Sequence, residues 1–262
     1  MICRICGAPA TKIFEAKIMD KYLVSYLHCS FCGFLQTEEP YWLNEAFEHA
    51  ISLWDTGILS RNYYAAKLTA VIIFFLFNSK AKFLDYGGGY GVLTRLMRDM
   101  GFDFYWYDLY ASNLFARGFE YVSGPDNIEL VTSFESFEHF VNPLDEIEKI
   151  LAVSKNVFFS TELLPPKIPQ PHDWWYYGLD HGQHLSFYSS RTLAYIAMKY
   201  NLNFYSNGTN IHLYSATPIN NRLFNSLLYF VNYGPFFVVK KLMKSKSLGD
   251  VSYLNSKHHT RK

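Results

Sequence analysis

Short apolar runs along the middle of the chain alternate with stretches whose apolar residues recur at helical spacing. A buried strand is expected from Phe83, a helix over 92–100, and a second strand over 102–107. Further strands are expected at 128–134 and 156–161, and an antiparallel pair at 203–206 and 211–216. This alternation predicts an α/β domain with a mostly parallel sheet. Between 108 and 128 the pattern is weaker, and it predicts a brief helix near 111–117 and a degenerate third strand at 119–122.

Two apolar segments flank this domain. The segment 68–77 is almost wholly apolar, but it is far shorter than the ~20 residues that cross a bilayer, so we expect a helix buried against the sheet. The segment 222–246 mixes apolar residues with lysines, and Gly234-Pro235 interrupts it. A basic amphipathic end of this kind most often covers the core or a dimer partner. Peripheral contact with an anionic membrane is the minority hypothesis.

The first strand runs into a glycine-rich loop, Asp85-Tyr86-Gly87-Gly88-Gly89-Tyr90-Gly91. Glycine lets the backbone turn tightly against a ligand, and the N-terminus of the following helix points toward that ligand. Asp108 ends the second strand, where an acid accepts hydrogen bonds from both ribose hydroxyls in doubly wound folds. Val92 stands where a dinucleotide site has its third glycine. The pattern therefore predicts a different nucleotide cofactor, and the leading acid suits a cationic group; the competing interpretation is a turn without a ligand.

The four cysteines form two identical pairs, Cys3-x-x-Cys6-Gly7 and Cys29-x-x-Cys32-Gly33. Each turn presents two sulfur ligands while backbone N–H groups hydrogen-bond the sulfurs, and the intervening segment is long enough for a hairpin. Four thiolates predict one closed, structural Zn²⁺ site, with no open position for catalysis. The alternative is two disulfides, which the absence of a signal peptide before Cys3 and a cytosolic cofactor disfavour.

Composition agrees with a compact enzyme. Half of the 262 residues are apolar, and the formal net charge is +1. Because lysine and arginine are scattered until the C-terminal segment, nothing indicates a nucleic-acid interface. Cysteine usage and the expected cofactor favour a cytoplasmic location.

The strand over 128–134 ends in Phe134-Glu135, and Glu138-His139 follows shortly after. Open α/β sheets bind ligands at the carboxyl ends of their strands, so Phe134 and Glu135 are expected beside the cofactor. For Glu138 and His139, packing at a helix start is favoured over catalysis. After the strand over 156–161, a long loop rich in proline and aromatic residues leads into His181-Gly182-Gln183-His184, and we interpret it as a substrate lid.

The acid-led glycine loop, Asp108 and the E-x-x-E-H run at 135–139 resemble those of class I S-adenosylmethionine-dependent methyltransferases. This resemblance implies a Rossmann-like, seven-stranded sheet with an antiparallel last strand. It also implies cofactor contacts from Asp85, Gly87, Gly88, Gly89, Gly91, Asp108, Leu109, Phe134 and Glu135.

The four-cysteine module and the stretch Gln183-His184-Leu185-Ser186-Phe187-Tyr188-Ser189 are similar to the zinc-containing sugar C-methyltransferases. On this match His184 takes the position of the active-site histidine of that family, and His181 is the next candidate for the base. The sequence differs from the motif of that family at two positions. Gln183 replaces a glutamate of the family's motif, and Gly182 replaces its first histidine.

These features predict transfer of a methyl group from S-adenosylmethionine to a small-molecule acceptor, with a nucleotide-linked sugar as the favoured class and His184 as the general base. C-methylation and O-methylation both stay open, the latter on a glycan, a lipid-linked sugar or another small molecule. A hypothesis from another class is a non-catalytic protein that keeps the cofactor fold and binds a partner. The expected organisation is a zinc-binding module at 1–36, a helical segment at 37–77, a methyltransferase domain at 78–218 and a helical, basic tail at 219–262.

Overall fold

The computed structural model describes residues 1–48, 56–122 and 127–260. The chain divides into two compact units, each built from two segments. The first unit comprises Met1–Trp54 and Phe134–Pro218, and the second comprises Asp55–Ser133 and Ile219–Lys262. The domain boundaries expected from the sequence stay predictions.

The second unit contains three parallel strands in the order β5-β4-β6. They are β4 (Lys82–Tyr86), β5 (Asp103–Tyr107) and β6 (Ile128–Ser133). Helix α3 (Val92–Asp99) connects β4 to β5, as the apolar spacing predicts. Phe83 is fully buried and stacks on Phe104 of the neighbouring strand, with the ring centroids 5.2 Å apart. The next residue, Leu84, points to the opposite face and is also fully buried, so β4 has apolar residues on both faces, as a buried parallel strand requires.

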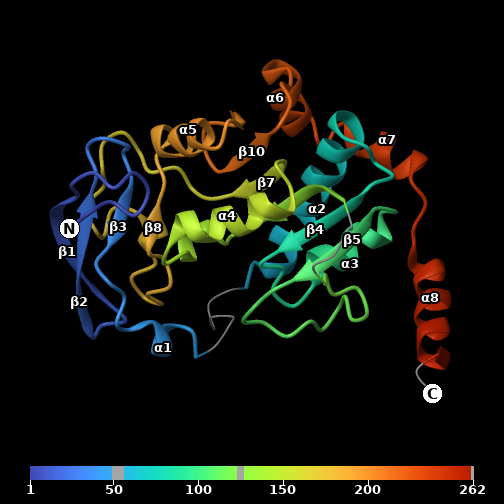
Figure 1. The fold of residues 1–262 in the computed structure, drawn as a ribbon, viewed down its shortest axis with the longest axis horizontal. Coiled ribbons are helices and arrows are strands. Elements are labelled where there is room, and N and C mark those ends of the chain that lie inside the picture. The colour runs from blue at the N-terminus through green and yellow to red at the C-terminus, as the bar shows by residue number, and fades with distance from the viewer. Residues whose placement is uncertain (49–55, 123–126, 261–262) are drawn as a thin grey trace. The chain divides into compact units, whose positions relative to one another are not determined.

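Helices complete the second unit (Figure 1). They are α2 (Ile58–Leu76), α6 (Asn221–Tyr229), α7 (Pro235–Leu242) and α8 (Ser247–Thr260), and α2 packs on α3, α6 and α7. The break at Gly234-Pro235 falls between α6 and α7, where Pro235 begins α7. Helix α8 is tied to α3 by a buried ion pair, in which Arg98 donates from Nε and Nη2 to the two carboxylate oxygens of Asp250 at 2.9 and 2.6 Å.

The first unit begins with the predicted hairpin, β1 (Thr11–Ile18) and β2 (Tyr22–His28), which lies between the two cysteine pairs. Strands β3 (Leu35–Thr37) and β8 (Ser186–Phe187) extend it into an antiparallel sheet in the order β1-β2-β3-β8. Strand β8 lies two residues after His184, so the sheet that carries the cysteines also fixes the histidine segment.

The first unit also contains an antiparallel group in the order β7-β10-β9, formed by β7 (Val157–Ser160), β10 (Ile211–Ser215) and β9 (Asn203–Ser206). The antiparallel pair expected at the end of the fold is thus confirmed. Helices α1 (Leu43–Ala46), α4 (Pro143–Val153) and α5 (Ser190–Lys199) belong to the same unit. Ser189 caps α5 by accepting a hydrogen bond from the backbone N–H of Thr192 at 3.1 Å.

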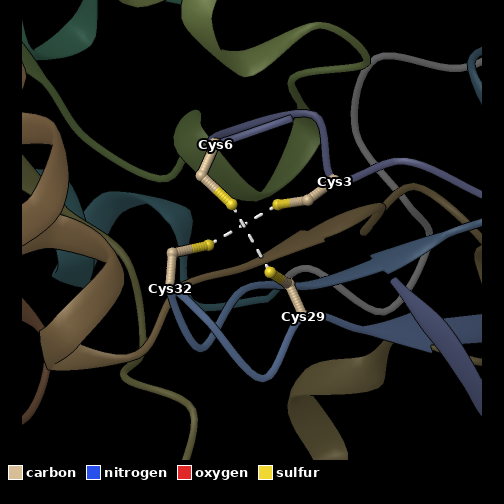
Figure 2. A group of neighbouring side chains, drawn as sticks. All are labelled: Cys3, Cys6, Cys29 and Cys32. Carbon is tan, nitrogen blue, oxygen red and sulfur yellow. Dashed lines mark hydrogen bonds between the residues drawn. The ribbon is translucent and has the colours of Figure 1, made fainter. Parts of the chain in front are cut away.

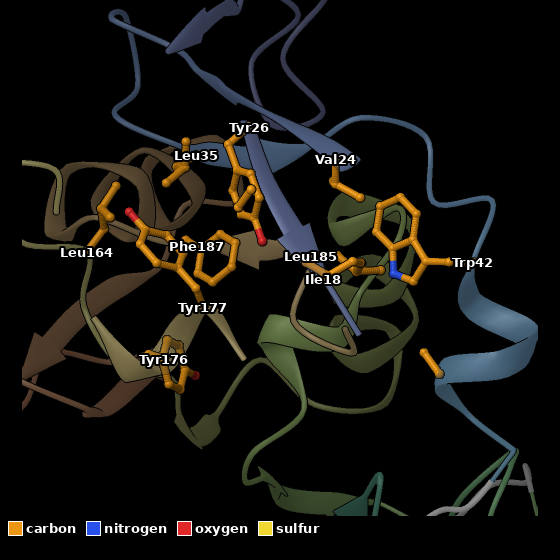
Figure 3. Packing of buried hydrophobic residues seen from close by; sticks show 12 residues of the cluster. Ile18, Val24, Tyr26, Leu35, Trp42, Leu164, Tyr176, Tyr177, Leu185 and Phe187 are labelled. Carbon is orange, nitrogen blue, oxygen red and sulfur yellow. The ribbon is translucent and has the colours of Figure 1, made fainter. Parts of the chain in front are cut away.

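A cluster of buried aromatic and aliphatic side chains joins the N-terminal sheet to the loop that follows β7 (Figure 3). Tyr26 of β2 packs edge-on against Tyr177 of the loop, with the ring centroids 5.4 Å apart. Trp42 donates from its indole N–H to the carbonyl of Gly182 at 2.8 Å. The loop interpreted as a lid therefore contributes side chains to the hydrophobic core of the first unit, and this part of the loop is fixed by packing.

Two expectations for the segment after β5 need correction. The helix near 111–117 is absent, because backbone N–H groups there bond elsewhere: Leu114 and Phe115 donate to the carbonyl of Tyr90 at 3.1 and 3.0 Å. The third strand is reduced to one isolated bridge between Trp106 and Glu120. Six strands, rather than seven, therefore represent the expected α/β sheet in the described residues. Among those residues, no helix combines the length and apolar character that a membrane crossing requires.

Candidate functional site

The glycine loop joins β4 to α3 and uses left-handed backbone conformations. Gly89 has a φ of 51° and Gly91, the residue before α3, has a φ of 84°. A Cβ atom on Gly91 would lie 2.7 Å from Oδ1 of Asn113, so packing alone explains that glycine. A Cβ atom on Gly89 would meet no atom within 4 Å. The loop thus leaves open space at Gly89, beside the N-terminus of α3.

Asp85 leads this loop from a buried position. The residue is 2% exposed, and its carboxylate accepts hydrogen bonds from Thr132 Oγ1 on β6 at 3.0 Å and from Thr94 Oγ1 on α3 at 3.1 Å. Burial raises the pKa of Asp85 to about 7, and the nearby charge of Asp108 acts in the same direction. Asp85 therefore anchors the loop to the neighbouring strand and helix, and it places a buried, ionisable carboxyl group behind the glycines.

Asp108 closes the loop from the end of β5. Its Oδ2 accepts a hydrogen bond from the backbone N–H of Gly89 at 2.9 Å, and its Oδ1 accepts from the N–H groups of Tyr110 and Ala111 at 2.7 and 2.8 Å. A carboxylate oxygen accepts two hydrogen bonds, so Oδ2 keeps one position for a ligand hydroxyl. Leu109, the next residue, is 57% exposed and offers an apolar surface beside that position.

Phe134 and Glu135 follow directly from the carboxyl end of β6. Phe134 packs edge-on against Phe158, with the ring centroids 5.4 Å apart. Glu135 is exposed and has a φ of 51°, an uncommon conformation for a residue with a side chain. Ser160 holds it in place, since its hydroxyl accepts from the backbone N–H of Glu135 at 2.9 Å and donates to Oε1 at 2.6 Å. Strained residues of this kind are concentrated at functional sites.

The four cysteines converge on one point (Figure 2). The Sγ atoms of Cys3 and Cys32 are 3.5 Å apart, as are those of Cys6 and Cys29, and all four thiols are free. A disulfide requires about 2.05 Å, whereas sulfurs around a tetrahedral Zn²⁺ at about 2.3 Å are spaced by about 3.8 Å. The backbone N–H of Ile5 also donates to Sγ of Cys3 at 3.4 Å, as expected for a metal knuckle. The arrangement fits a zinc ion and gives no support to the disulfide alternative.

The two histidines proposed as bases differ in tautomer. Nδ1 of His184 lies 2.6 Å from the carbonyl oxygen of Tyr176, which can only accept, so Nδ1 carries the proton and Nε2 has a free lone pair. Nδ1 of His181 instead accepts from the backbone N–H of Gln183 at 3.1 Å, which places the proton of its neutral ring on Nε2. Of the two, His184 is therefore the one that presents a basic nitrogen. Burial lowers the pKa of both rings.

Sequence reasoning missed the neighbours of His184. Glu138 and His139 lie in a short 3₁₀ turn at Phe137–His139, and their ligating atoms lie within 4.8 Å of one another and of a ring nitrogen of His184. Nδ1 of His139 lies 3.0 Å from the carbonyl oxygen of Gln183, so its proton also sits on Nδ1. Burial, assisted by the charge of Glu135, raises the pKa of Glu138 well above its ordinary value.

Comparison with known proteins adds a family to this geometry. Residues 60–207, more than half of the chain, match the family model described as "Methyltransferase domain". The chain belongs to this methyltransferase family. It has the α/β Rossmann-like fold of these enzymes, with a mostly parallel sheet, added antiparallel strands at the N-terminus and four clustered cysteines. No curated protein matches this methyltransferase.

Solved structures similar to this methyltransferase include TnmH, with 17% identity, a TM-score of 0.47 and coverage of 67% of this chain. The chain spans 61% of the length of TnmH. The plantazolicin methyltransferase BpumL, in complex with a desmethyl plantazolicin analogue and SAH, matches with 12% identity and a TM-score of 0.49 over 78% of this chain and 88% of its own. An O-methyltransferase family protein from Burkholderia thailandensis has 12% identity and a TM-score of 0.46, and 68% of each chain is covered.

Proposed function

We propose that this methyltransferase transfers a methyl group from S-adenosylmethionine to a small-molecule acceptor. The observation that carries the proposal is the loop after β4, where Gly89 leaves open space and Asp108 keeps one acceptor position free. When bound, S-adenosylmethionine supplies a methyl group on a positively charged sulfonium. The buried, ionisable carboxyl group of Asp85 and the carboxylate of Glu135 suit such a cation.

The residues that would hold this cofactor have distinct roles. Gly89, which leaves open space, would let the backbone approach it closely, whereas Gly88 and Gly91 are packed against Trp106 and Asn113. Asp108 would accept one hydrogen bond from a ribose hydroxyl through Oδ2, and Leu109 would cover the adenine with its exposed side chain. Phe134 and Glu135, at the end of the next strand, would bound the methionine part, as ligand sites at strand carboxyl ends do.

We propose His184 as the general base toward the acceptor. Its Nδ1–H is committed to the carbonyl of Tyr176, so Nε2 is fixed in orientation and free to take a proton. The acceptor atom, a carbon beside a carbonyl or a hydroxyl oxygen, loses its proton to Nε2 and attacks the methyl carbon, while the carbon–sulfur bond breaks. His181 is less suited, because its Nδ1 lone pair already accepts from the backbone of Gln183.

The favoured acceptor is a nucleotide-linked sugar. This finer assignment rests on the likeness of the segment at 183–189 to that of the sugar C-methyltransferases. Gln183, which replaces the glutamate of that family, donates from Nε2 to the carbonyl of Ala46 at 2.7 Å and acts as a tether. Because the Gln183 side chain holds the backbone of Ala46, it does not favour C-methylation over O-methylation, and both products are kept as alternatives.

The cysteine cluster would hold one structural Zn²⁺, and four thiolates leave no position for a substrate. The bound ion would fix the first residues of the chain against the turn between β2 and β3. That turn leads into the sheet of β3 and β8, and β8 directly follows His184. Zinc would thus act on catalysis by holding the segment that carries the base. Four reduced thiols also fit a cytoplasmic location.

Mass spectrometry with methyl-deuterated S-adenosylmethionine tests the proposal. The purified protein is incubated with the labelled cofactor and a pool of nucleotide-linked sugars that includes 4-keto sugars, and fragmentation locates the label. A label on carbon that is lost in His184→Ala supports sugar C-methylation with His184 as base, and a label in a methoxyl group assigns O-methylation. His172→Ala, an exposed histidine on the same loop, is the matched control. No label on any compound would contradict the sugar as acceptor.

A further inference from the structure

Three side chains that can bind a metal ion converge inside the first unit. They are Glu138, His139 and His184, and their ligating atoms all lie within 4.8 Å of one another. Glu138 and His139 come from the 3₁₀ turn after β6, and His184 comes from the segment before β8. The backbone joins these two segments, because the N–H of Leu185 donates to the carbonyl of Glu138 at 2.8 Å. The cluster is thus held by main-chain contacts as well as by packing.

Glu138 is the group that needs an explanation. It is 1% exposed, and neither of its carboxylate oxygens has a hydrogen bond of good geometry in the described structure. The hydroxyls of Tyr176 and Thr161 lie near enough to lower its pKa, but they are hydrogen-bonded to each other at 3.1 Å. Burying a carboxyl group without a partner is costly, and native proteins rarely leave one unsatisfied. The occupant that would satisfy it is a cation or a proton.

The hydrogen bonds of His139 and His184 favour a cation over a proton as this occupant. Both rings place the Nδ1–H on a backbone carbonyl, that of Gln183 for His139 and that of Tyr176 for His184. Both Nε2 lone pairs are therefore free, and the rings cannot pivot. Histidines that bind metals show this arrangement, in which a carbonyl or carboxylate fixes the ring through its other nitrogen. A protonated Glu138 has one O–H to donate, whereas a metal ion would bind a nitrogen of each ring together with the carboxylate.

We infer that Glu138, His139 and His184 bind one divalent transition-metal ion. Two imidazole nitrogens and one carboxylate oxygen select an ion of the Mn²⁺ to Zn²⁺ series over Mg²⁺ or Ca²⁺, which prefer oxygen ligands throughout. Three protein ligands leave coordination positions open, as in catalytic metal sites and unlike the four-cysteine cluster. This site is separate from the cysteines in composition, residues and role.

The consequence for catalysis rests on the proposed methyl transfer, but it replaces His184 as the general base. An ion in this site would bind an acceptor oxygen and lower the pKa of that oxygen or of an adjacent C–H group. His184 would then be a ligand, and direct proton removal by its Nε2 would belong to the metal-free protein. The acceptor class that fits best carries an oxygen at the reacting position, such as a hydroxyl or a carbonyl of a sugar.

Metal binding tests the inference without any methylation assay. Protein that contains one zinc per chain is dialysed against Mn²⁺ and, separately, against Co²⁺, and elemental analysis counts zinc and the added ion per chain. We expect one added ion in the wild type, with affinity weakened about 100-fold or more in Glu138→Gln and His184→Asn. The matched controls are Glu162→Gln, an acid outside the cluster, and His172→Asn; both should bind like the wild type. Far-UV circular dichroism confirms folding of each variant, and Glu138→Gln keeps the shape of the side chain.

Two results would overturn the inference: no added ion of either metal in the wild type, or unchanged binding in Glu138→Gln. A chelator that leaves the cysteine-bound zinc in place separates this inference from the proposed function. If label transfer is unchanged by this chelator and is lost in His184→Ala, the proposed function is supported and the metal site is rejected. Metal binding without label transfer would keep the metal site and reject the acceptor.

Discussion

Replacing Asp85 with asparagine should abolish a pH dependence of stability that originates in the cofactor loop. Asp85 is 2% exposed, and burial raises its pKa to about 7 in the folded protein. In the unfolded chain an aspartate ionises near pH 4. Between these values the unfolded state has released the proton and the folded state has not. The contribution of Asp85 to the unfolding free energy is therefore fully present below about pH 4, and it is lost as the pH rises toward and through 7.

The magnitude follows from the difference between the two pKa values. About 3 pKa units correspond to about 4 kcal/mol of unfolding free energy, reached when both states are ionised. Asp85→Asn removes the ionisable group. Its amide can still accept from Thr132 and donate to Thr94, so the two contacts of the carboxylate are preserved in kind. The difference in stability between variant and wild type should then grow by several kcal/mol between pH 4 and pH 8.

Urea unfolding followed by far-UV circular dichroism at pH 4, 5, 6, 7 and 8 measures this difference, because other titrating groups cancel between the two proteins. Asp173→Asn, at an exposed position, is the control and should follow the wild type at every pH. A difference between Asp85→Asn and wild type that stays constant across this range would refute the assignment of a buried, ionising carboxylate. S-Adenosylmethionine, as a cation, should also bind Asp85→Asn more weakly than wild type, and more so at pH 8 than at pH 6.

Three further predictions address the rest of the molecule. Elemental analysis of protein purified without chelators should find one zinc per chain that is lost in Cys32→Ser. This variant should also transfer less label, while it still binds S-adenosylmethionine. Asp250→Ala should lower the unfolding free energy by about 3–5 kcal/mol, measured by urea titration, because it leaves the buried guanidinium of Arg98 without its bidentate partner. Asp108→Ala should weaken S-adenosylmethionine binding about 10-fold or more in calorimetry, since it removes both the ribose acceptor and the bond to Gly89.

Features encoded by local sequence were predictable. The helix α3 follows from the spacing of its apolar residues, and the break between α6 and α7 follows from Gly234-Pro235, because proline begins a helix more readily than it continues one. The cysteine cluster follows from two short turns of identical spacing. For the helices the determining residues lie within a few positions of one another, and for the cysteines they lie within two such turns.

Features set by distant partners were not predictable. The helix expected near 111–117 is replaced by irregular backbone because Tyr90, on the glycine loop, accepts the N–H groups of Leu114 and Phe115. The convergence of Glu138 and His184 depends on a backbone contact across 47 positions, from Leu185 to Glu138. The tautomers of His181 and His184 depend on which backbone group each ring meets. Such contacts exist only after the chain has folded, so no local pattern records them.

Isothermal titration calorimetry with S-adenosylmethionine tests the central claim most directly, because it requires neither the acceptor nor a metal at Glu138. The proposal predicts one binding site per wild-type chain, competition by S-adenosylhomocysteine, and clearly weaker binding in Asp108→Ala. An absence of binding by folded, zinc-containing protein would contradict the assignment of the loop after β4 as a cofactor site, and with it the proposed methyl transfer.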